Sequence, residues 1–430
     1  MKAIRTLTSA ALLLALGTTT AQAAALADIY QQALQNDPQL KSSRASTLAD
    51  QQAAPIAKAN LLPQLDLKAS ASDVNSDTSD FDSQGYTLSL SQPLFDASSW
   101  YGFKQGEELS EQAELVFAQA QQNLILRVVT AYLDVLRAQT ALETTQAEER
   151  AIKRRLDQVN AQFEVGLIAI TDVQEAQASY DIARVNRIEA EGALDNSFEA
   201  IERLTAQPFG DIDILHADYP VQNLIPAESQ PWLEKAWQGN YDLQIANASI
   251  DVQRLGLKAT RSGHLPTVFV SASHDSTNGS ATSNATTDTT TLALNVNVPI
   301  FSGYRTTSQT TQAQYDLDAT HQNREDTLRA VTQSTRSLLR DLRTNVQSVS
   351  ARAQSIKSSE TALKATEEGF KVGTRNVVDV LQAEQTLYQS QRDYANARYD
   401  YVFNLFSLKQ QVGTLNPDDI KALDEWLVKP

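Results

Sequence analysis

Two similar stretches decide the fold of this sequence: Phe163-Glu164-Val165-Gly166 followed by Thr171-Asp172-Val173, and Phe370-Lys371-Val372-Gly373 followed by Val378-Asp379-Val380. Their glycines lie 207 residues apart. Glycine readily adopts the left-handed backbone that ends many helices, so each stretch predicts a tight turn between two helices. A pattern that occurs twice at this distance indicates an internal duplication.

Further landmarks repeat in the same order on the same frame. Leu62-Pro63 matches Leu265-Pro266, and Pro93-Leu94-Phe95 matches Pro299-Ile300-Phe301. In each half the first landmark precedes an alternating segment and the second follows another. Each half is therefore predicted to contain a short helix, two strands, a long helix, a turn and a return helix.

The predicted strands have two different faces. In the first strand Leu65, Leu67, Ala69 and Ala71 alternate with polar residues, and the other three strands show the same period of two. About ten residues is the length of a tilted membrane-spanning strand. A water-soluble sandwich sheet is the alternative source of such alternation. The polar segments 73–84 and 276–290 are predicted to be external loops.

Four strands cannot close a barrel, and an open edge in lipid would leave backbone groups unpaired. A trimer would supply twelve strands, enough to close one. The predicted fold class is therefore an α+β membrane protein, with a trimeric twelve-stranded β-barrel to which each protomer contributes four strands.

The two long helices are predicted to build a tube. At about 1.5 Å per residue each spans roughly 100 Å. Two adjacent apolar stripes run along the first one, through Ile125, Val129 and Tyr132 and through Leu124, Val128 and Val135. Two stripes give a helix a neighbour on each side, which is typical of a cylinder wall. The short and return helices are each about half as long, so end to end they match the long helix.

These lengths divide the chain into five parts. Residues 1–23 form a signal peptide, residues 24–210 a first repeat, residues 211–231 an equatorial linker, residues 232–415 a second repeat, and residues 416–430 a C-terminal equatorial segment. The first repeat has strands 64–73 and 85–95, long helix 98–163 and return helix 172–204, and the second has strands 267–276 and 290–301, long helix 304–370 and return helix 379–412.

Composition excludes several classes of protein. A basic start, a short apolar run and Ala21-Gln22-Ala23 predict a cleaved secretion signal. Its loss takes the formal charge from −16 to −18, which argues against nucleic acid as a partner. The sequence has no cysteine, and its four histidines are scattered without metal-ligand spacing. We therefore expect no catalytic site, no metal and no cofactor.

With these landmarks in place, the chain resembles the TolC family of outer-membrane efflux and secretion ducts. The resemblance covers nearly all of the mature chain. Its most specific segments are 61–65, 163–173, 263–267, 372–381 and 395–399. It implies a homotrimer in the outer membrane of a Gram-negative bacterium, whose barrel continues into a long α-helical barrel in the periplasm with coiled-coil tips.

The resemblance also implies partners and a transport function. Periplasmic adaptor proteins and inner-membrane pumps would dock at the helix tips, as part of tripartite efflux pumps or type I secretion systems, and outer-membrane lipid would surround the barrel. The adaptor-docking tips would be Val165, Gly166, Leu167, Val372, Gly373 and Thr374. A trimeric coiled-coil adhesin or periplasmic scaffold is the alternative, but it does not explain two strand pairs within the chain.

The resemblance places a pore gate at the same end. Thr171 and Asp172 would face Arg375, and three copies of Asp379 would meet near the threefold axis. Phe370 and Gln382 depart from the family's namesake, which has a tyrosine and a second aspartate there, so one hydroxyl link is lost and the acidic ring is thinner. Arg155 and Glu367 occupy another link position and are predicted to form a charged tie.

Overall fold

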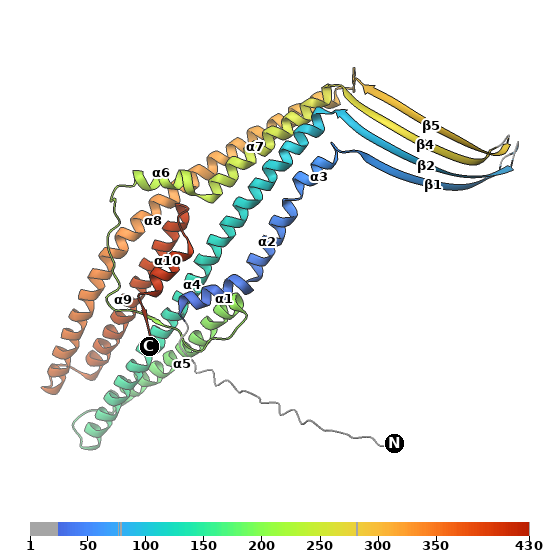
Figure 1. The fold of residues 1–430 in the computed structure, drawn as a ribbon. Coiled ribbons are helices and arrows are strands. Elements are labelled where there is room, and N and C mark those ends of the chain that lie inside the picture. Colours follow the sequence, from blue (N-terminus) through green and yellow to red (C-terminus); the bar gives the residue numbers. More distant parts are fainter. Residues whose placement is uncertain (1–24, 76, 78–79, 281–282, 430) are drawn as a thin grey trace, which may run out of the picture.

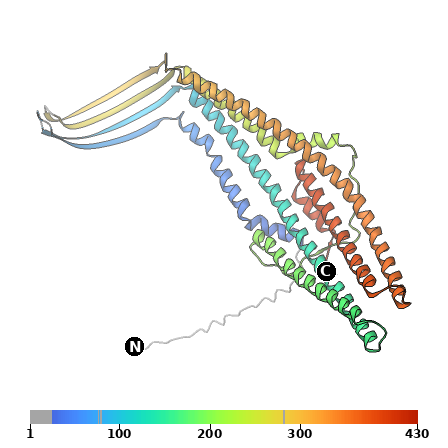
Figure 2. The same ribbon diagram turned by 180° about the vertical axis from the view of Figure 1, so that it is seen from behind.

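A computed structural model describes residues 25–75, 77, 80–280 and 283–429. The predicted signal peptide lies outside the described residues. The molecule is long, with four strands at one end and two tight turns between helices at the other (Figure 1). The view from behind shows the same separation (Figure 2).

The helices of the first half follow the predicted order but not all of the predicted bounds. The predicted first helix is three helices, because Pro38 lacks the N–H that a helix interior needs and Asp37 caps a new helix by accepting a hydrogen bond from the Leu40 amide. These elements are α1 (Leu26–Asn36), α2 (Pro38–Asp50), α3 (Ala53–Ala59), α4 (Ala97–Glu164) and α5 (Ile170–Thr205).

The second half repeats the pattern with one break in its short helix. Asn240 ends one helix and caps the next, with its side chain accepting from the Leu243 amide, so the predicted single short helix is wrong here too. The elements are α6 (Gln230–Gly239), α7 (Tyr241–Arg261), the 3₁₀ turn η1 (Ser262–His264), α8 (Arg305–Lys371) and α9 (Val377–Gln411). Among the described residues, we find no helix with the length and apolarity needed to cross a membrane.

The sheet consists of two hairpins side by side in the order β1-β2-β4-β5, with all neighbours antiparallel. Its strands are β1 (Gln64–Asn75), β2 (Asp80–Phe95), β4 (Thr267–Ser280) and β5 (Ser283–Asn297). The prediction that segments 73–84 and 276–290 are loops is wrong, since both are largely paired strand. Backbone pairing does not depend on apolar side chains, so two paired strands can continue into polar sequence beyond their apolar residues.

Two prolines shape the base of the sheet. Pro93 lies in the central strand β2 at a break in register with β4, which fits its missing N–H. The last strand ends at Asn297 rather than at residue 301, since Val298-Pro299 leaves the ladder. The chain therefore leaves the sheet four residues earlier than the alternation of Val296, Val298 and Ile300 predicts.

Apolar side chains lie on one face of the sheet, and no other described element of the protomer covers this face. Leu67 is 68% exposed and Leu292 is 77% exposed. The outermost strands β1 and β5 each have an unpaired edge in one protomer. Three copies joined edge to edge bring twelve strands into one closed barrel.

Short elements form a belt that lies against the middle of the helices. It contains α10 (Pro417–Asp424) and a short pair formed by β3 (Ile214–Leu215) and β6 (Leu427–Val428). The largest apolar cluster lies beneath this belt, where α1, the middle of α4, and the ends of α5 and α9 meet. Tyr132, Leu133 and Leu136 of α4 are almost completely buried there. The belt thus lies where the short helices stack end to end.

A close backbone contact joins the belt to the break between α6 and α7. Gly413 has a φ of +73°, and a Cβ there would overlap the Gly239 carbonyl group. The Asn240 side chain donates a hydrogen bond to the Gln411 carbonyl oxygen at 3.0 Å. Only glycine fits at position 413.

We predict that Gly413→Ala destabilises the protein by about 2–4 kcal/mol, through the positive φ and the overlap. The matched control is Gly192→Ala within α5, where a Cβ would meet no atom within 4 Å and helix propensity would improve by up to ~1 kcal/mol. Thermal unfolding of the two variants measures both effects. Equal stability of the two variants would contradict the prediction.

Candidate functional site

The turns that connect α4 to α5 and α8 to α9 have the same backbone geometry. Gly166 has a φ of +74° and Gly373 a φ of +76°. At the first turn the Gly166 amide donates to the Phe163 carbonyl oxygen and the Leu167 amide to that of Gln162, each at 2.9 Å. This pair of bonds is a Schellman motif, which requires the left-handed glycine.

Large apolar side chains at these turns are exposed. Val165 is 70% exposed, Leu167 is 73% exposed and Val372 is 74% exposed. Thr374 lies beside them, and its hydroxyl donates to the Gly369 carbonyl oxygen at 3.1 Å. Both turns lie at the end of the molecule opposite to the strands (Figure 1). The end of the tube therefore presents apolar side chains that have no partner within one protomer.

The second turn also orders two charged residues of the predicted gate. Asn376 and Asp379 form a reciprocal capping box at the start of α9, with bonds of 2.8 and 3.2 Å. Arg375 Nη1 lies 3.8 Å from Asp379 Oδ2, and the arginine side chain is 60% exposed. An exposed pair of this kind contributes only about 0–1 kcal/mol. Within one protomer, the main role of Asp379 is to cap α9.

Thr171 and Asp172, which were predicted to face Arg375, do not contact it within one protomer. In the described part of the chain, no hydrogen bond or ion pair links Asp172 or Thr171 to Arg375. Gln382 lines a small cavity of about 130 Å³ with Ile182 and Val378, between α5 and α9. Contact of Asp172 with Arg375 in the trimer stays a prediction.

Arg155 is a mostly buried charged group near the tips. It projects from α4, with only 10% of its side chain exposed, and its Nη2 lies 2.7 Å from Glu367 Oε1 of α8 and 3.1 Å from Glu384 Oε1 of α9. Its guanidinium carbon lies 5.9 Å from the centre of the Phe370 ring. One side chain thus ties the first helical hairpin to both helices of the second.

Glu384 is the partner that sequence reasoning missed. Its side chain is 6% exposed, and its second carboxylate oxygen is buried without a hydrogen bond. Burial raises the pKa of Glu384, while the nearby charge of Arg155 acts in the opposite direction. Its position on the apolar stripe of α9, four residues after the buried Val380, is the sequence signal that indicates a buried side chain.

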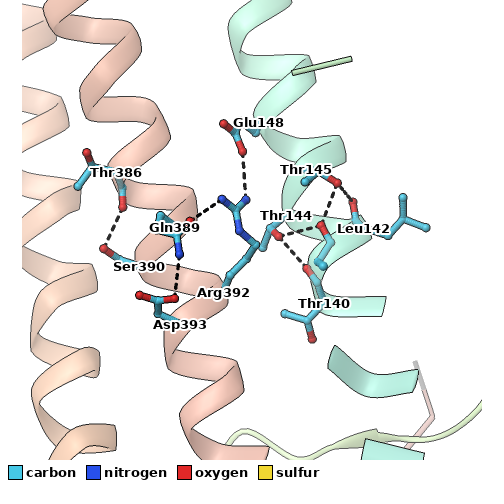
Figure 3. Close-up of polar contacts among 11 residues, drawn as sticks. Thr140, Leu142, Thr144, Thr145, Glu148, Thr386, Gln389, Ser390, Arg392 and Asp393 are labelled. Atoms are coloured by element: carbon cyan, nitrogen blue, oxygen red, sulfur yellow. Dashed lines mark hydrogen bonds and ion pairs between the residues drawn. The ribbon is translucent and has the colours of Figure 1, made fainter. Parts of the chain in front are cut away.

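The same two helices, α4 and α9, are joined by further polar contacts away from the tips. Arg392 Nη1 lies 3.1 Å from Glu148 Oε2, which is buried, and Arg392 also donates to Gln389 (Figure 3). Arg137 pairs with Asp400 at 2.8 Å. Residue numbers rise on α4 as they fall on α9, so these contacts form one antiparallel seam. Its last charged contact before the turns is Arg155 with Glu384.

Apolar side chains fill the space around that contact. Ile152, Leu156 and Val159 of α4 pack with Val173 and Ala176 of α5 and with Val377 and Leu381 of α9. The ring of Phe370 lies partly buried against this cluster. The arrangement holds the ends of the two hairpins together through a mostly buried ion pair surrounded by apolar side chains, and loss of that pair would weaken the contact near the turns.

We predict that Glu384→Gln changes how stability depends on pH. Because the pKa of Glu384 is raised in the folded state, the folded protein keeps this proton to a higher pH than the unfolded chain does. The contribution of Glu384 to stability therefore falls as the pH rises from the ordinary pKa of a glutamate to the raised pKa. The glutamine variant should therefore gain stability relative to the wild type as pH rises. Chemical unfolding measured at several pH values tests this.

The control is Glu191→Gln, which removes an exposed carboxylate paired with Arg187 on α5. This variant should keep the pH dependence of the wild type. A constant stability difference between wild type and Glu384→Gln at every pH would contradict the prediction.

Comparison with known proteins gives consistent matches over the whole chain. The outer membrane efflux protein family matches residues 29–207 and 232–414, one segment in each repeat. The outer membrane protein TolC of Vibrio cholerae is 38% identical over 94% of this chain and 93% of its own length. The alkaline protease secretion protein AprF of Pseudomonas aeruginosa is 29% identical over 93% of this chain and 86% of its own.

Solved structures share the fold at lower sequence identity. A structure of CusC, described as undergoing folding and transmembrane channel formation, has a TM-score of 0.80 and 16% identity, and covers 90% of this chain and 92% of that one. At this identity the likeness concerns the fold alone.

Proposed function

The chain belongs to the outer membrane efflux protein family. We propose that the contacts of Arg155 form part of the gate of a channel, and that the two turns at Gly166 and Gly373 form its docking surface. The protein is an outer-membrane channel for efflux and secretion, and not an enzyme. It works as a homotrimer with a periplasmic adaptor protein and an inner-membrane pump. The barrel lies in the outer membrane and the helices extend into the periplasm.

The gate proposal rests on one observation, the desolvated contact of Arg155 with Glu384 and Glu367. An open entrance needs the hairpin of α4 and α5 to move relative to that of α8 and α9. This contact joins the two hairpins about one to two and a half turns of helix before their ends, so separation there must break it. We assign Thr171, Asp172, Arg375, Asp379, Gln382 and Phe370 supporting roles in the trimer.

The presence of Glu384 changes which variants are informative. An exchange of Arg155 and Glu367 would leave a glutamate at position 155 beside the buried Glu384 carboxylate, and the two like charges would repel. A double-mutant cycle with neutral glutamine at each position avoids this repulsion.

We predict that Arg155→Gln increases the single-channel open probability of purified trimers in a planar bilayer. Breaking a buried ion pair costs ~3–5 kcal/mol, enough to shift a gate by about tenfold or more. Addition of Glu367→Gln to this variant should have little further effect.

Arg137→Gln is the matched control for the gate. It breaks another contact of α4 with α9, but that pair is partly exposed and lies about 27 Å further along the helix. It should leave the open probability close to that of the wild type. Equal gating by Arg155→Gln and wild type would rule out this contact as part of the gate.

The docking proposal rests on the exposed apolar turns. We propose that Val165, Gly166 and Leu167, together with Val372, Gly373 and Thr374, are the surface that the adaptor protein contacts. Exposed apolar side chains on a rigid turn match the anchors found at the centre of protein interfaces. The two turns are equivalent in backbone, so each protomer offers two similar contacts.

We predict that the double variant Val165→Asp, Leu167→Asp lowers export by about tenfold or more, because charge at a buried interface anchor opposes docking. Trimers should form normally, since both side chains are exposed in the protomer. Export is measured in cells that lack their own channel, with trimers followed by electrophoresis.

The control is Ile225→Asp in the linker, where the side chain is 91% exposed and far from the turns. This variant should export at the wild-type rate. Full export by the Val165, Leu167 variant with an intact gate would remove the docking role of this turn.

A further inference from the structure

Aromatic residues gather where the strands meet the long helices. Trp100, Tyr101 and Phe103 lie on the first turns of α4, directly after β2. Trp100 is 50% exposed, and its ring centre lies 6.1 Å from that of Phe103. Tryptophan combines an apolar ring with a polar N–H and is common at the boundary between membrane and water.

Two lysines accompany these rings. Lys104 Nζ lies 5.5 Å from the Trp100 ring centre and 5.4 Å from that of Phe103. Lys258 Nζ, on the neighbouring helix α7, lies 5.9 Å from the Tyr101 ring centre. Lys258 has no ion pair with any described acidic residue, and Lys104 has only an exposed pair with Glu107 at 2.7 Å. We call Trp100, Tyr101, Phe103, Lys104 and Lys258 the headgroup collar.

Acidic residues follow the collar on α4. Glu107, Glu108 and Glu111 come after Lys104, and Asp251 lies nearby on α7, where it pairs with Arg254. Burial raises the pKa of Glu108, and Glu111 and Asp251 raise it further. After β2 the order is therefore the helix cap Asp96, the aromatic rings, Lys104 and the three glutamates, with Trp100 about 16 Å from Glu111 along the helix.

This order matches the chemistry of one membrane leaflet. Apolar strand residues contact acyl chains, aromatic rings lie at the carbonyl level, and lysines reach the phosphates while keeping their stems in apolar surroundings. The carboxylates of Glu107, Glu108 and Glu111, further from the membrane, would repel a phosphate that lay below the lysines. The protein as a whole is acidic, so two lysines at this level stand out against its net charge of −16.

We propose that the headgroup collar binds an anionic phospholipid of the periplasmic leaflet, with Lys104 and Lys258 contacting its phosphate and Trp100 packing along its glycerol and upper acyl chain. The residues of α4 in the collar follow β2 directly, so we place the collar beside the part of the barrel that lies in the outer membrane. Phosphatidylglycerol has the required phosphodiester and one net negative charge. The site would retain this lipid in preference to a zwitterionic one.

Trp100 itself can report the bound lipid. The chain has four tryptophans, and Trp232→Phe, Trp237→Phe and Trp426→Phe leave Trp100 alone. Full-length trimers of this variant are inserted into phosphatidylcholine vesicles that contain a minor fraction of phosphatidylglycerol brominated on its acyl chains. Parallel vesicles contain the same fraction of brominated phosphatidylcholine. Bromine quenches a tryptophan that it contacts.

We expect quenching by brominated phosphatidylglycerol to indicate a local enrichment of about tenfold, given two lysines at the surface of the leaflet. High salt should reduce this enrichment. In the same background, Lys104→Gln with Lys258→Gln should bring quenching to the phosphatidylcholine level. Lys235→Gln, which removes a lysine 5.0 Å from the ring centre at position 232 on α6, should leave it unchanged.

Equal quenching by the two brominated lipids in the tryptophan-reduced protein would overturn the proposal, as would enrichment that persists without both lysines. If the glutamine variants fail to insert, Lys104→Arg with Lys258→Arg must retain the enrichment. Binding of the lipid is read directly and does not depend on export or gating, so the outcome is separate from that of the gate and docking experiments.

Discussion

The need to pair backbone groups at the edges of the sheet governs the rest of this structure. One protomer places β1 and β5 at open edges, and lipid offers no hydrogen bonds to their N–H and C=O groups. Closure through three copies satisfies them. The trimer in turn sets the circumference of the helical tube, because each strand pair continues directly into long helices (Figure 1).

Contacts between α4 and α9 then determine how the two hairpins of one protomer lie against each other. Buried charges are costly unless they are paired, so Glu148 with Arg392 and Glu384 with Arg155 are compatible with few alternative registers. The apolar cluster around Ile152 and Leu381 fills the space between them. A gate built on such a seam combines rigidity along most of the tube with one contact near its end that a docked partner could break.

Much of this architecture could be predicted from local sequence signals. Alternation at Leu65, Leu67 and Ala69 predicted the strands, and Gly166 and Gly373 predicted the two turns at which both long helices end. The breaks at Pro38 and Asn240 were missed because the apolar pattern continues across them. The strands run beyond the predicted hairpin ends for a similar reason: polar side chains at Asp73 and Asp82 do not prevent their backbones from pairing.

The sequence by itself determined the duplicated frame, the two left-handed glycine turns and the apolar face of the strands, because each depends on residues a few positions apart. The family resemblance predicted Glu367 as one partner of Arg155, but only the tertiary structure showed the second, Glu384, which lies 229 residues away on α9. It also placed Lys258 beside Tyr101, on a helix from the other repeat. Contacts of this range follow from how helices pack around a common core, which no local pattern specifies.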